Sequence, residues 1–206
     1  KGKGYYVIKK YYSKKETDLA QKIIQKEIKK NQNYKKIQKN FSLDKKFKSI
    51  NIYNLLNLSE VFIKMIQPKI IMNAFQKLMG NFINTWFAAQ CSLAGCRGQN
   101  LHIDYPYVRY NNPDQKIPVG MGSENFLLSC GILTYLTKSD STNYGPLILN
   151  NSHKFRKFPS IHDFKNKKFI KLKIPEGGIL IFNSLIWHAG LPNYSSKQDR
   201  YLLVAH

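Results

Sequence analysis

The second half of the chain, from about Thr85, is a succession of short apolar segments separated by turn residues, and this limits the fold more than any other feature. NFLLSCGILTYLT is an apolar run of strand type, and KKFIKLKIP alternates lysine with apolar residues, the pattern of a half-buried strand. Asn143–Pro146 and Pro175–Gly178 have the composition of tight turns. Many short strands at close spacing predict a β-sandwich or barrel.

The first stretch, to about Asn84, has a different character. Ser13 followed three residues later by Glu16 is the capping box of a helix start, and Tyr5–Ile8 before it is a short strand-type run. The predicted apolar side of that helix consists of Leu19, Ile23, Ile24 and Ile28. Further helices are predicted over Ser59–Met65 and over Ile70–Met79, the latter closed by Gly80.

The polar, lysine-rich stretch Lys29–Lys48 is predicted as an exposed loop or a frayed helix end. A length of 206 residues suits one domain with a sizeable core. We therefore expect a single domain over 1–206, in which a mainly helical part (1–84) packs on a β core (85–206).

The charge is strongly positive, with 33 basic and 12 acidic residues and a formal net charge of +21. Such a field attracts nucleic acid, anionic membranes or phosphorylated substrates. Lysine, asparagine, isoleucine and tyrosine are all abundant while arginine is scarce, a joint bias typical of AT-rich coding drift. We therefore do not expect a dedicated nucleic-acid role, although a basic nucleic-acid-binding protein stays an alternative.

The three cysteines, Cys91, Cys96 and Cys130, follow no metal or disulfide spacing. Reduced, buried thiols in a cytoplasmic protein are the simplest interpretation. No apolar run is long enough to cross a bilayer, so no membrane span is expected.

Three residues form a candidate metal site. In a strand, His102 and Asp104 would project from the same face, while Ile103 points into the opposite layer. His188, 84 residues beyond Asp104 (188 − 104), ends the apolar strand-type run GILIFNSLIWH. Taken alone, His188 is better explained as a hydrogen-bonded core residue. Two histidines and one carboxylate on one face are the ligand set of the non-haem Fe(II) oxygenases.

Arg200 follows His188 by 12 residues (200 − 188), with Gly190, Pro192 and Asn193 between them in the manner of a hairpin turn. We expect Arg200 to enter the neighbouring strand and point back toward the metal. A guanidinium binds a carboxylate through two parallel hydrogen bonds, which suits the distal carboxylate of 2-oxoglutarate. The alternative is that Arg200 starts a strand at the surface.

Four blocks of the sequence, in order, resemble the phytanoyl-CoA dioxygenase family of Fe(II)/2-oxoglutarate oxygenases. They are GYYVIKKYYSKKETD, QNLHIDYP, NYGPLILNNSHK and PEGGILIFNSLIWHAGLPNYSSKQDR. The resemblance implies a mainly β fold, a double-stranded β-helix (jelly-roll, cupin-like barrel) with N-terminal helices packed on the major sheet. It places His102, Asp104 and His188 on the family's metal ligands and Arg200 on its 2-oxoglutarate arginine.

The resemblance also implies an activity. The cofactors would be Fe(II), 2-oxoglutarate and O2, and the reaction would be hydroxylation of an unactivated C–H bond with release of succinate and CO2. Gly190 departs from the pattern, because many members carry serine or threonine there to hold the 2-oxoglutarate carboxylate. Tyr201 or Asn125 are candidate replacements. His153, which matches the family's S-H stretch, is expected to be structural.

The substrate does not follow from the sequence beyond a small organic molecule. The loops Pro106–Ser123 and Asn150–Lys168 are expected to rim the pocket. An anionic substrate would be favoured by Lys116, Lys154, Arg156 and Lys157 unless these are solvated surface residues. Pocket-shaping and core packing are both open for Tyr105, Tyr107 and Trp187. A non-catalytic cupin-like binding module is the second alternative.

Overall fold

The computed structural model describes residues 2–32, 41–106, 116–117, 127–140, 145–195 and 197–206. Within this part of the chain, two antiparallel sheets face each other. The larger has the order β1-β8-β5-β10-β4-β3-β2 and the smaller the order β7-β6-β9. The strands are β1 (Tyr5–Ile8), β2 (Phe41–Asp44), β3 (Ser49–Ile52), β4 (Phe87–Ser92), β5 (Cys130–Tyr135), β6 (Pro146–Ile148), β7 (Ile170–Lys171), β8 (Ile179–Asn183), β9 (His188–Gly190) and β10 (Arg200–Ala205).

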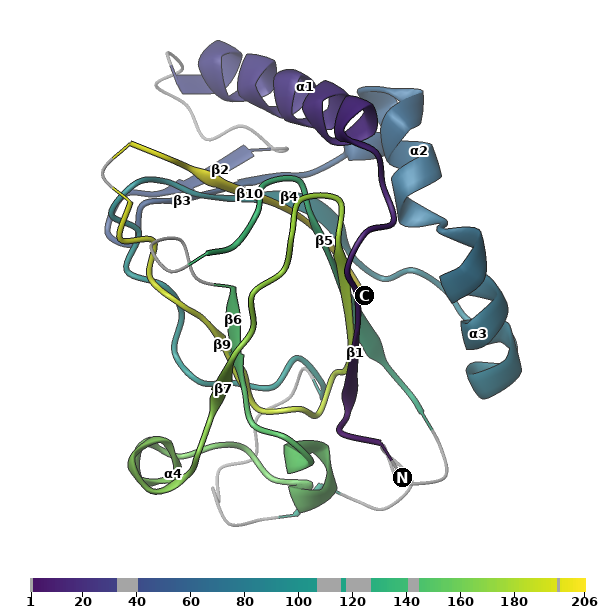
Figure 1. The fold of residues 1–206 in the computed structure, drawn as a ribbon, viewed down its shortest axis with the longest axis vertical. Coiled ribbons are helices and arrows are strands. Elements are labelled where there is room, and N and C mark those ends of the chain that lie inside the picture. Colours follow the sequence, from purple (N-terminus) through teal and green to yellow (C-terminus); the bar gives the residue numbers. More distant parts are fainter. Residues whose placement is uncertain (1, 33–40, 107–115, 118–126, 141–144, 196) are drawn as a thin grey trace.

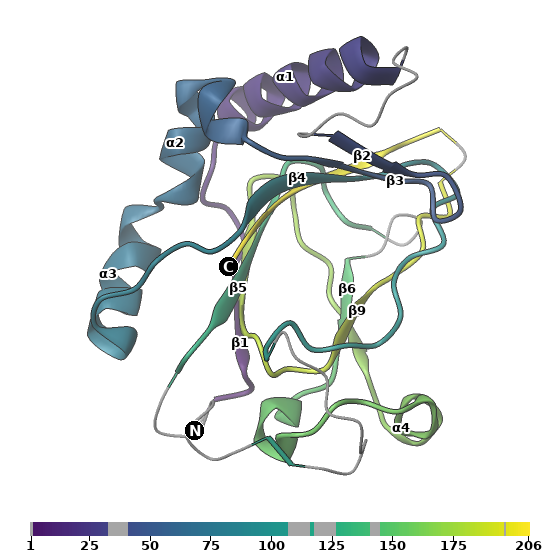
Figure 2. The same ribbon diagram turned by 180° about the vertical axis from the view of Figure 1, so that it is seen from behind.

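Three N-terminal helices lie on the outer side of the large sheet, away from the small one (Figures 1 and 2). They are α1 (Lys14–Gln32), α2 (Glu60–Ile66) and α3 (Lys69–Met79). Shorter elements are η1 (Leu55–Asn57), η2 (Ser152–Phe155) and α4 (Ile161–Asn166). This arrangement confirms the predicted mainly β jelly-roll fold with helices packed on the major sheet. None of the helices in the described residues is both long and apolar enough to span a membrane.

The first helix begins as its capping box predicts. The Ser13 backbone N–H donates to Glu16 Oε2 at 2.8 Å, and the Glu16 N–H donates to Ser13 Oγ at 3.3 Å. Ala20, Ile24 and Ile28 are buried along one line of α1. The prediction for Leu19 is wrong: its side chain is 48% exposed, because the buried line runs through Ala20 one position further on.

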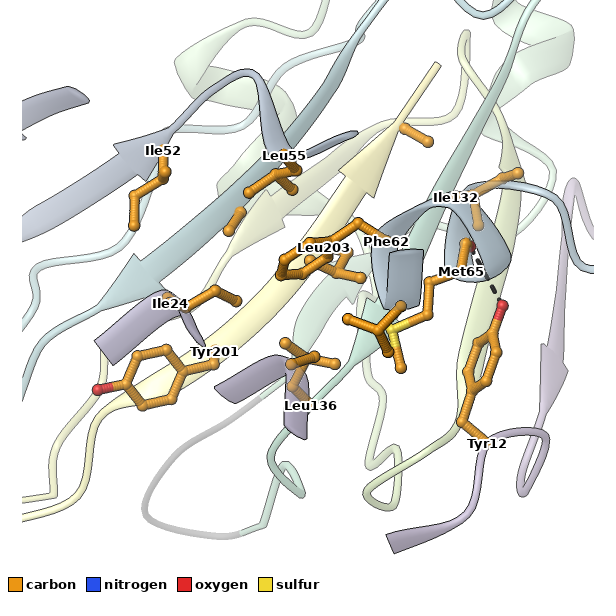
Figure 3. Packing of buried hydrophobic residues seen from close by; sticks show 14 of the residues in the cluster. Tyr12, Ile24, Ile52, Leu55, Phe62, Met65, Ile132, Leu136, Tyr201 and Leu203 are labelled. Carbon is orange, nitrogen blue, oxygen red and sulfur yellow. Dashed lines mark hydrogen bonds between the residues drawn. The ribbon is translucent and has the colours of Figure 1, made fainter. Parts of the chain in front are cut away.

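The outer face of the large sheet and the helices share one apolar core (Figure 3). Phe62 and Met65 of α2 pack over Leu203 of β10 and Leu136 beyond β5. The Tyr12 hydroxyl donates to the Met65 carbonyl at 3.1 Å, which ties the chain before α1 to α2. Helix packing therefore uses alternate residues of each strand, and leaves the others to face inward.

The inner residues of the same strands line a cavity between the two sheets. On β10, Tyr201 and Leu203 belong to the outer core, whereas Arg200, Leu202 and Val204 line the cavity. The cavity has a volume of about 470 Å³. One strand thus serves both the core and the cavity.

Two strand predictions differ from the structure. GILIFNSLIWHAG, predicted as one strand, is two: β8 in the large sheet and β9 in the small one. Between them, Asn183 builds a turn, because its backbone carbonyl accepts from the Ile186 N–H at 2.8 Å and its Oδ1 accepts from the Leu185 N–H at 2.9 Å. KKFIKLKIP pairs only through Ile170 and Lys171, as β7.

The helical N-terminal part also contributes strands to the large sheet. The strand predicted at Tyr5–Ile8 is present as β1, which pairs with β8. The prediction of a loop or frayed helix end to Lys48 missed β2. β3, immediately after it, places Ile50 and Ile52 in the outer core and pairs with β4. The many lysines around these strands make the alternation of apolar and polar residues too short to recognise in the sequence, so the strands become evident only from their pairing in the sheet.

Candidate metal centre

The two histidines of the candidate site are paired through their backbones. The His102 N–H donates to the His188 carbonyl at 2.9 Å, and the His188 N–H donates to the His102 carbonyl at 3.0 Å. His188 begins β9, while His102 makes only an isolated bridge to it, so the predicted strand around His102 is wrong. The predicted facing still holds, because Ile103 packs into a separate apolar cluster with Leu149 and Trp187.

Asp104 lies between the two imidazoles. Its Oδ1 is 3.5 Å from His102 Nε2, and its Oδ2 is 3.4 Å from His188 Nε2. One ligand atom from each of the three residues lies within 4.8 Å of the others. The Asp104 N–H donates to the Ser184 carbonyl at 2.9 Å, in the turn between β8 and β9. The same turn that separates the two strands therefore holds the carboxylate in place.

Hydrogen bonds on the far side of each ring fix which nitrogen is free to bind a metal. His102 Nδ1 lies 2.7 Å from the Asn100 carbonyl, and His188 Nδ1 lies 2.9 Å from the Ile186 carbonyl. Because a carbonyl oxygen only accepts, Nδ1 carries the proton in both rings. Both Nε2 lone pairs are left facing Asp104, which is the arrangement that metal-ligating histidines require.

The charges of the site suit a cation. Burial alone raises the pKa of Asp104, but the surrounding imidazoles, led by His188, outweigh burial and lower it to about 2. Burial lowers the pKa of His188 to about 4 despite the neighbouring Asp104. For His102, burial lowers the pKa, but the hydrogen bond and charge of Asp104 prevail and the net shift is upward. At neutral pH the carboxylate is ionised and His188 is neutral, so both can donate lone pairs.

Arg200 starts β10 and faces the same cavity. It is 4% exposed, and its Nη2 donates to Ser92 Oγ and to the Leu191 carbonyl, each at 3.1 Å. Leu191 follows β9 directly, so these bonds bring the guanidinium to the end of the strand that carries His188. Arg200 therefore does not start its strand at the surface. The expected hairpin with His188 is wrong, because β10 pairs with β4 and β5.

A third imidazole, His206, stands beside the carboxylate and was missed by the sequence analysis. Its Nε2 is 3.8 Å from Asp104 Oδ2, and burial lowers its pKa. It comes directly after β10 and lines the same cavity as Arg200, Leu202 and Val204 of that strand. Side chains alternate between the two faces of a strand, so an inward-facing Arg200 implies that residues 202, 204 and 206 also face inward. This pattern could have identified His206 from the sequence.

The side chain of Gln99 fills the space that a side chain at position 190 would need. A Cβ added to Gly190 would lie 2.7 Å from Gln99 Oε1, and Gln99 lines the cavity. Tyr201 is not a replacement for a hydroxyl at this place, because it faces the outer core and its hydroxyl donates to Asp199 Oδ2 at 3.3 Å. Asn125 lies outside the described residues.

Other predicted pocket residues are placed elsewhere or not described. Trp187 is a core residue: it is fully buried, and its Nε1–H donates to the Lys157 carbonyl at 2.9 Å. Tyr105 lines a second, apolar cavity of about 810 Å³ between α3 and the sheet. Tyr107 lies outside the described residues. His153 lies in η2 beside Gly4, apart from the three-residue cluster, as expected of a structural residue.

Most of the predicted loop Pro106–Ser123 lies outside the described residues. Pro106, Phe158 and Pro159 line a third cavity of about 710 Å³ next to His102 and Asp104. The described lining of this cavity and of the one between the sheets contains none of Lys116, Lys154, Arg156 and Lys157.

A jelly roll that gathers two imidazoles and one carboxylate around an open cavity defines the class of non-haem metal oxygenases. The model of the phytanoyl-CoA dioxygenase (PhyH) family matches residues 1–201, and the chain belongs to this family. It is an Fe(II)- and 2-oxoglutarate-dependent oxygenase that also uses O2. No curated protein matches the chain.

The fold is similar to that of HygX from Streptomyces hygroscopicus in two solved structures. One has nickel and 2-oxoglutarate bound, and the other has nickel, 2-oxoglutarate and hygromycin B bound. In each case the TM-score is 0.68, the identity is 12%, and the match covers 99% of this chain and 82% of the HygX chain. At this identity the comparison shows a common fold.

Proposed function

We propose that Nε2 of His102, Nε2 of His188 and the carboxylate of Asp104 hold the Fe(II). The observation that carries this assignment is the pair of Nδ1–H bonds to the Asn100 and Ile186 carbonyls, which leaves both Nε2 lone pairs directed at the carboxylate. The depressed pKa of Asp104 supports it, because an ionised carboxylate beside the neutral imidazole of His188 suits a divalent cation. The ligands come from one side, so the cavity side stays open for co-substrate and substrate.

We further propose that Arg200 binds the distal carboxylate of 2-oxoglutarate. Its guanidinium is buried in the cavity wall, and Ser92 and Leu191 hold one of its terminal nitrogens in place. A guanidinium offers several donors in a rigid plane, which suits the two oxygens of a carboxylate. Inorganic anions and 2-oxoglutarate should therefore compete for this end of the cavity.

The proposed reaction is hydroxylation of an unactivated C–H bond in a small organic substrate, with release of succinate and CO2. When bound, the metal and 2-oxoglutarate would activate O2, the oxidant, one of whose oxygen atoms would go to the substrate and the other to succinate. The chain itself supplies ligand geometry and a water-excluding wall, formed by Leu133, Phe182, Leu202 and Val204. Substrate would approach through the cavity beside Phe158 and Pro159.

The test is an anaerobic titration with Fe(II) and 2-oxoglutarate, which follows the visible metal-to-ligand charge-transfer band of the chelate. His188→Ala should abolish the band, and Arg200→Ala should raise the 2-oxoglutarate concentration needed for it by more than tenfold. The matched controls are His162→Ala and Arg97→Ala, whose side chains are exposed. A folded, iron-loaded chain without the band would refute the assignment.

A non-catalytic binding module would give the band but no succinate when oxygen is admitted with candidate substrates, so succinate formation separates the two functions. We also propose that the chain acts as one domain in the cytoplasm. The support for this placement is that Cys91, Cys96 and Cys130 are buried free thiols.

A further inference from the structure

His206 is held firmly in place beside the proposed metal ligands. Its backbone N–H donates to the Trp86 carbonyl at 3.0 Å, and its carbonyl accepts from the Thr85 N–H at 2.7 Å. Its side chain is 13% exposed, and its ring meets the Phe182 ring edge-on with the centroids 6.5 Å apart. Phe182 also contacts His188, at a centroid distance of 4.8 Å. The backbone of His206 is therefore fixed by two hydrogen bonds, and its imidazole packs against Phe182, which also contacts the proposed ligand His188.

The two nitrogens of His206 have different surroundings. Nδ1 is buried and has no hydrogen-bond partner among the described residues. Nε2 lies 3.8 Å from Asp104 Oδ2. A neutral imidazole carries one proton, which is favoured on the nitrogen that faces an acceptor, and a charged imidazole carries a proton on both. In either charge state Nε2 carries a proton and faces the carboxylate, at a distance longer than a hydrogen bond.

The position of His206 makes it a support for the carboxylate rather than another ligand. The atoms that can converge on one ion belong to His102, Asp104 and His188, and His206 is outside that group. It approaches Asp104 from β10, whereas the Asp104 backbone is held by the turn after β8. Groups in this relation to a metal ligand fix its orientation and keep it ionised.

We propose that His206 is a positioning residue: its Nε2–H, 3.8 Å from Oδ2 of Asp104, attracts the carboxylate and so presents it to the metal in one orientation. This inference rests on the proposed function, because it assumes that Asp104 is a ligand. Loss of such a support lowers metal affinity by about 10- to 100-fold in comparable sites.

The test compares three substitutions by anaerobic titration of the whole chain with Fe(II), and with Co(II) as a spectroscopic substitute, both without 2-oxoglutarate. The amide nitrogen of His206→Gln falls near the place of Nε2, whereas that of His206→Asn falls near Nδ1. His206→Leu removes both donors. We expect the asparagine and leucine variants to bind metal about 10- to 100-fold more weakly, with an altered Co(II) visible spectrum. The glutamine variant should stay within about threefold of the parent chain.

Thermal unfolding of each metal-free variant separates positioning from folding. Glutamine and asparagine differ by one methylene and are both polar, so this pair decides the question even where leucine lowers stability. Equal affinities for the two would overturn the proposal, as would a leucine variant with the parent's affinity. If the parent chain itself binds no metal, the proposed function fails; if it binds and the variants are unaffected, only this inference fails.

Discussion

The two faces of the large sheet are built from the same strands but have different roles: one packs against the helices and the other borders the cavity. On β10, Tyr201 and Leu203 face outward into an apolar core under the helices (Figure 3), and Ala205 belongs to the same core. Arg200, at the start of β10, and His206, directly after it, line the inner cavity. The outer face is filled by side chains from α1, α2 and α3. The inner face borders a cavity of about 470 Å³ and places charged groups there. The odd-numbered residues of β10 thus contribute to the apolar core, and the even-numbered residues line the cavity that holds the candidate site.

This division predicts that outer-face substitutions act on folding and inner-face substitutions on binding. Buried charges and open volume on the inner face are costly for folding. The apolar burial on the outer face offsets that cost. The following substitutions test the separation, from the largest expected effect to the smallest.

The largest expected effect is that of Phe62→Ala on the outer face. Phe62 of α2 is fully buried, and its removal leaves a cavity over Leu203. Such truncations lower the free energy of unfolding by about 3–5 kcal/mol. Denaturant unfolding measures this, with Phe164→Ala as control, because Phe164 is half exposed and should cost less than about 1 kcal/mol. Metal affinity of the folded fraction should be unchanged, and a loss of affinity would contradict the separation of faces.

On the inner face, Asp104→Ala should do the reverse. Removal of a carboxylate ligand should weaken Fe(II) binding by more than about 100-fold, or about 2.7 kcal/mol. Stability of the metal-free chain should fall by less than it does in Phe62→Ala, because no apolar contact is lost and only the attraction between Asp104 and the imidazoles is removed. Asp18→Ala on α1, where the carboxylate pairs only with Lys14 at the surface, is the matched control for both measurements. A large destabilisation without metal would mean that the inner charges also hold the fold.

Gly131→Ala is the substitution expected to break the separation. Gly131 of β5 lies opposite Phe182 of β8, and an added Cβ would overlap the Phe182 ring. Phe182 contacts His188, so the ring cannot move without disturbing a proposed ligand. We expect a loss of about 1–3 kcal/mol in unfolding free energy together with weaker Fe(II) binding. If stability falls and affinity does not, the inner wall is more compliant than its packing indicates.

The sequence predicts features whose cause is local. The start of α1 follows from Ser13 and Glu16, and the end of α3 at Gly80 follows from a residue with φ of 72°. The shared facing of His102 and Asp104 also holds, although the backbone there is not a strand. In each case the relevant contacts lie within a few residues along the chain, so the pattern contains the information.

Features that depend on pairing between distant strands were missed. Nothing in the apolar run GILIFNSLIWHAG except Asn183 marks the change from one sheet to the other. β2 and β3 are defined by their pairing with each other and with β4. Such partners follow from the packing of the whole chain, which periodicity in a single segment does not contain.

The smallest effect we predict concerns Glu16, whose capping box anchors α1 over the outer face. Hydrogen bonds from Ser13 lower the pKa of Glu16. Its ionised form therefore stabilises the fold above the ordinary carboxyl pKa, and this contribution is lost as pH falls through the lowered value. Glu16→Gln should cost about 0.5 kcal/mol at neutral pH and nothing once the parent's Glu16 is protonated. Unfolding measured across this pH range checks the sign, with Glu27→Gln, near the other end of α1, as control. A cost that persists at acid pH would mean that Glu16 acts through packing, and that α1 is attached by its apolar side alone.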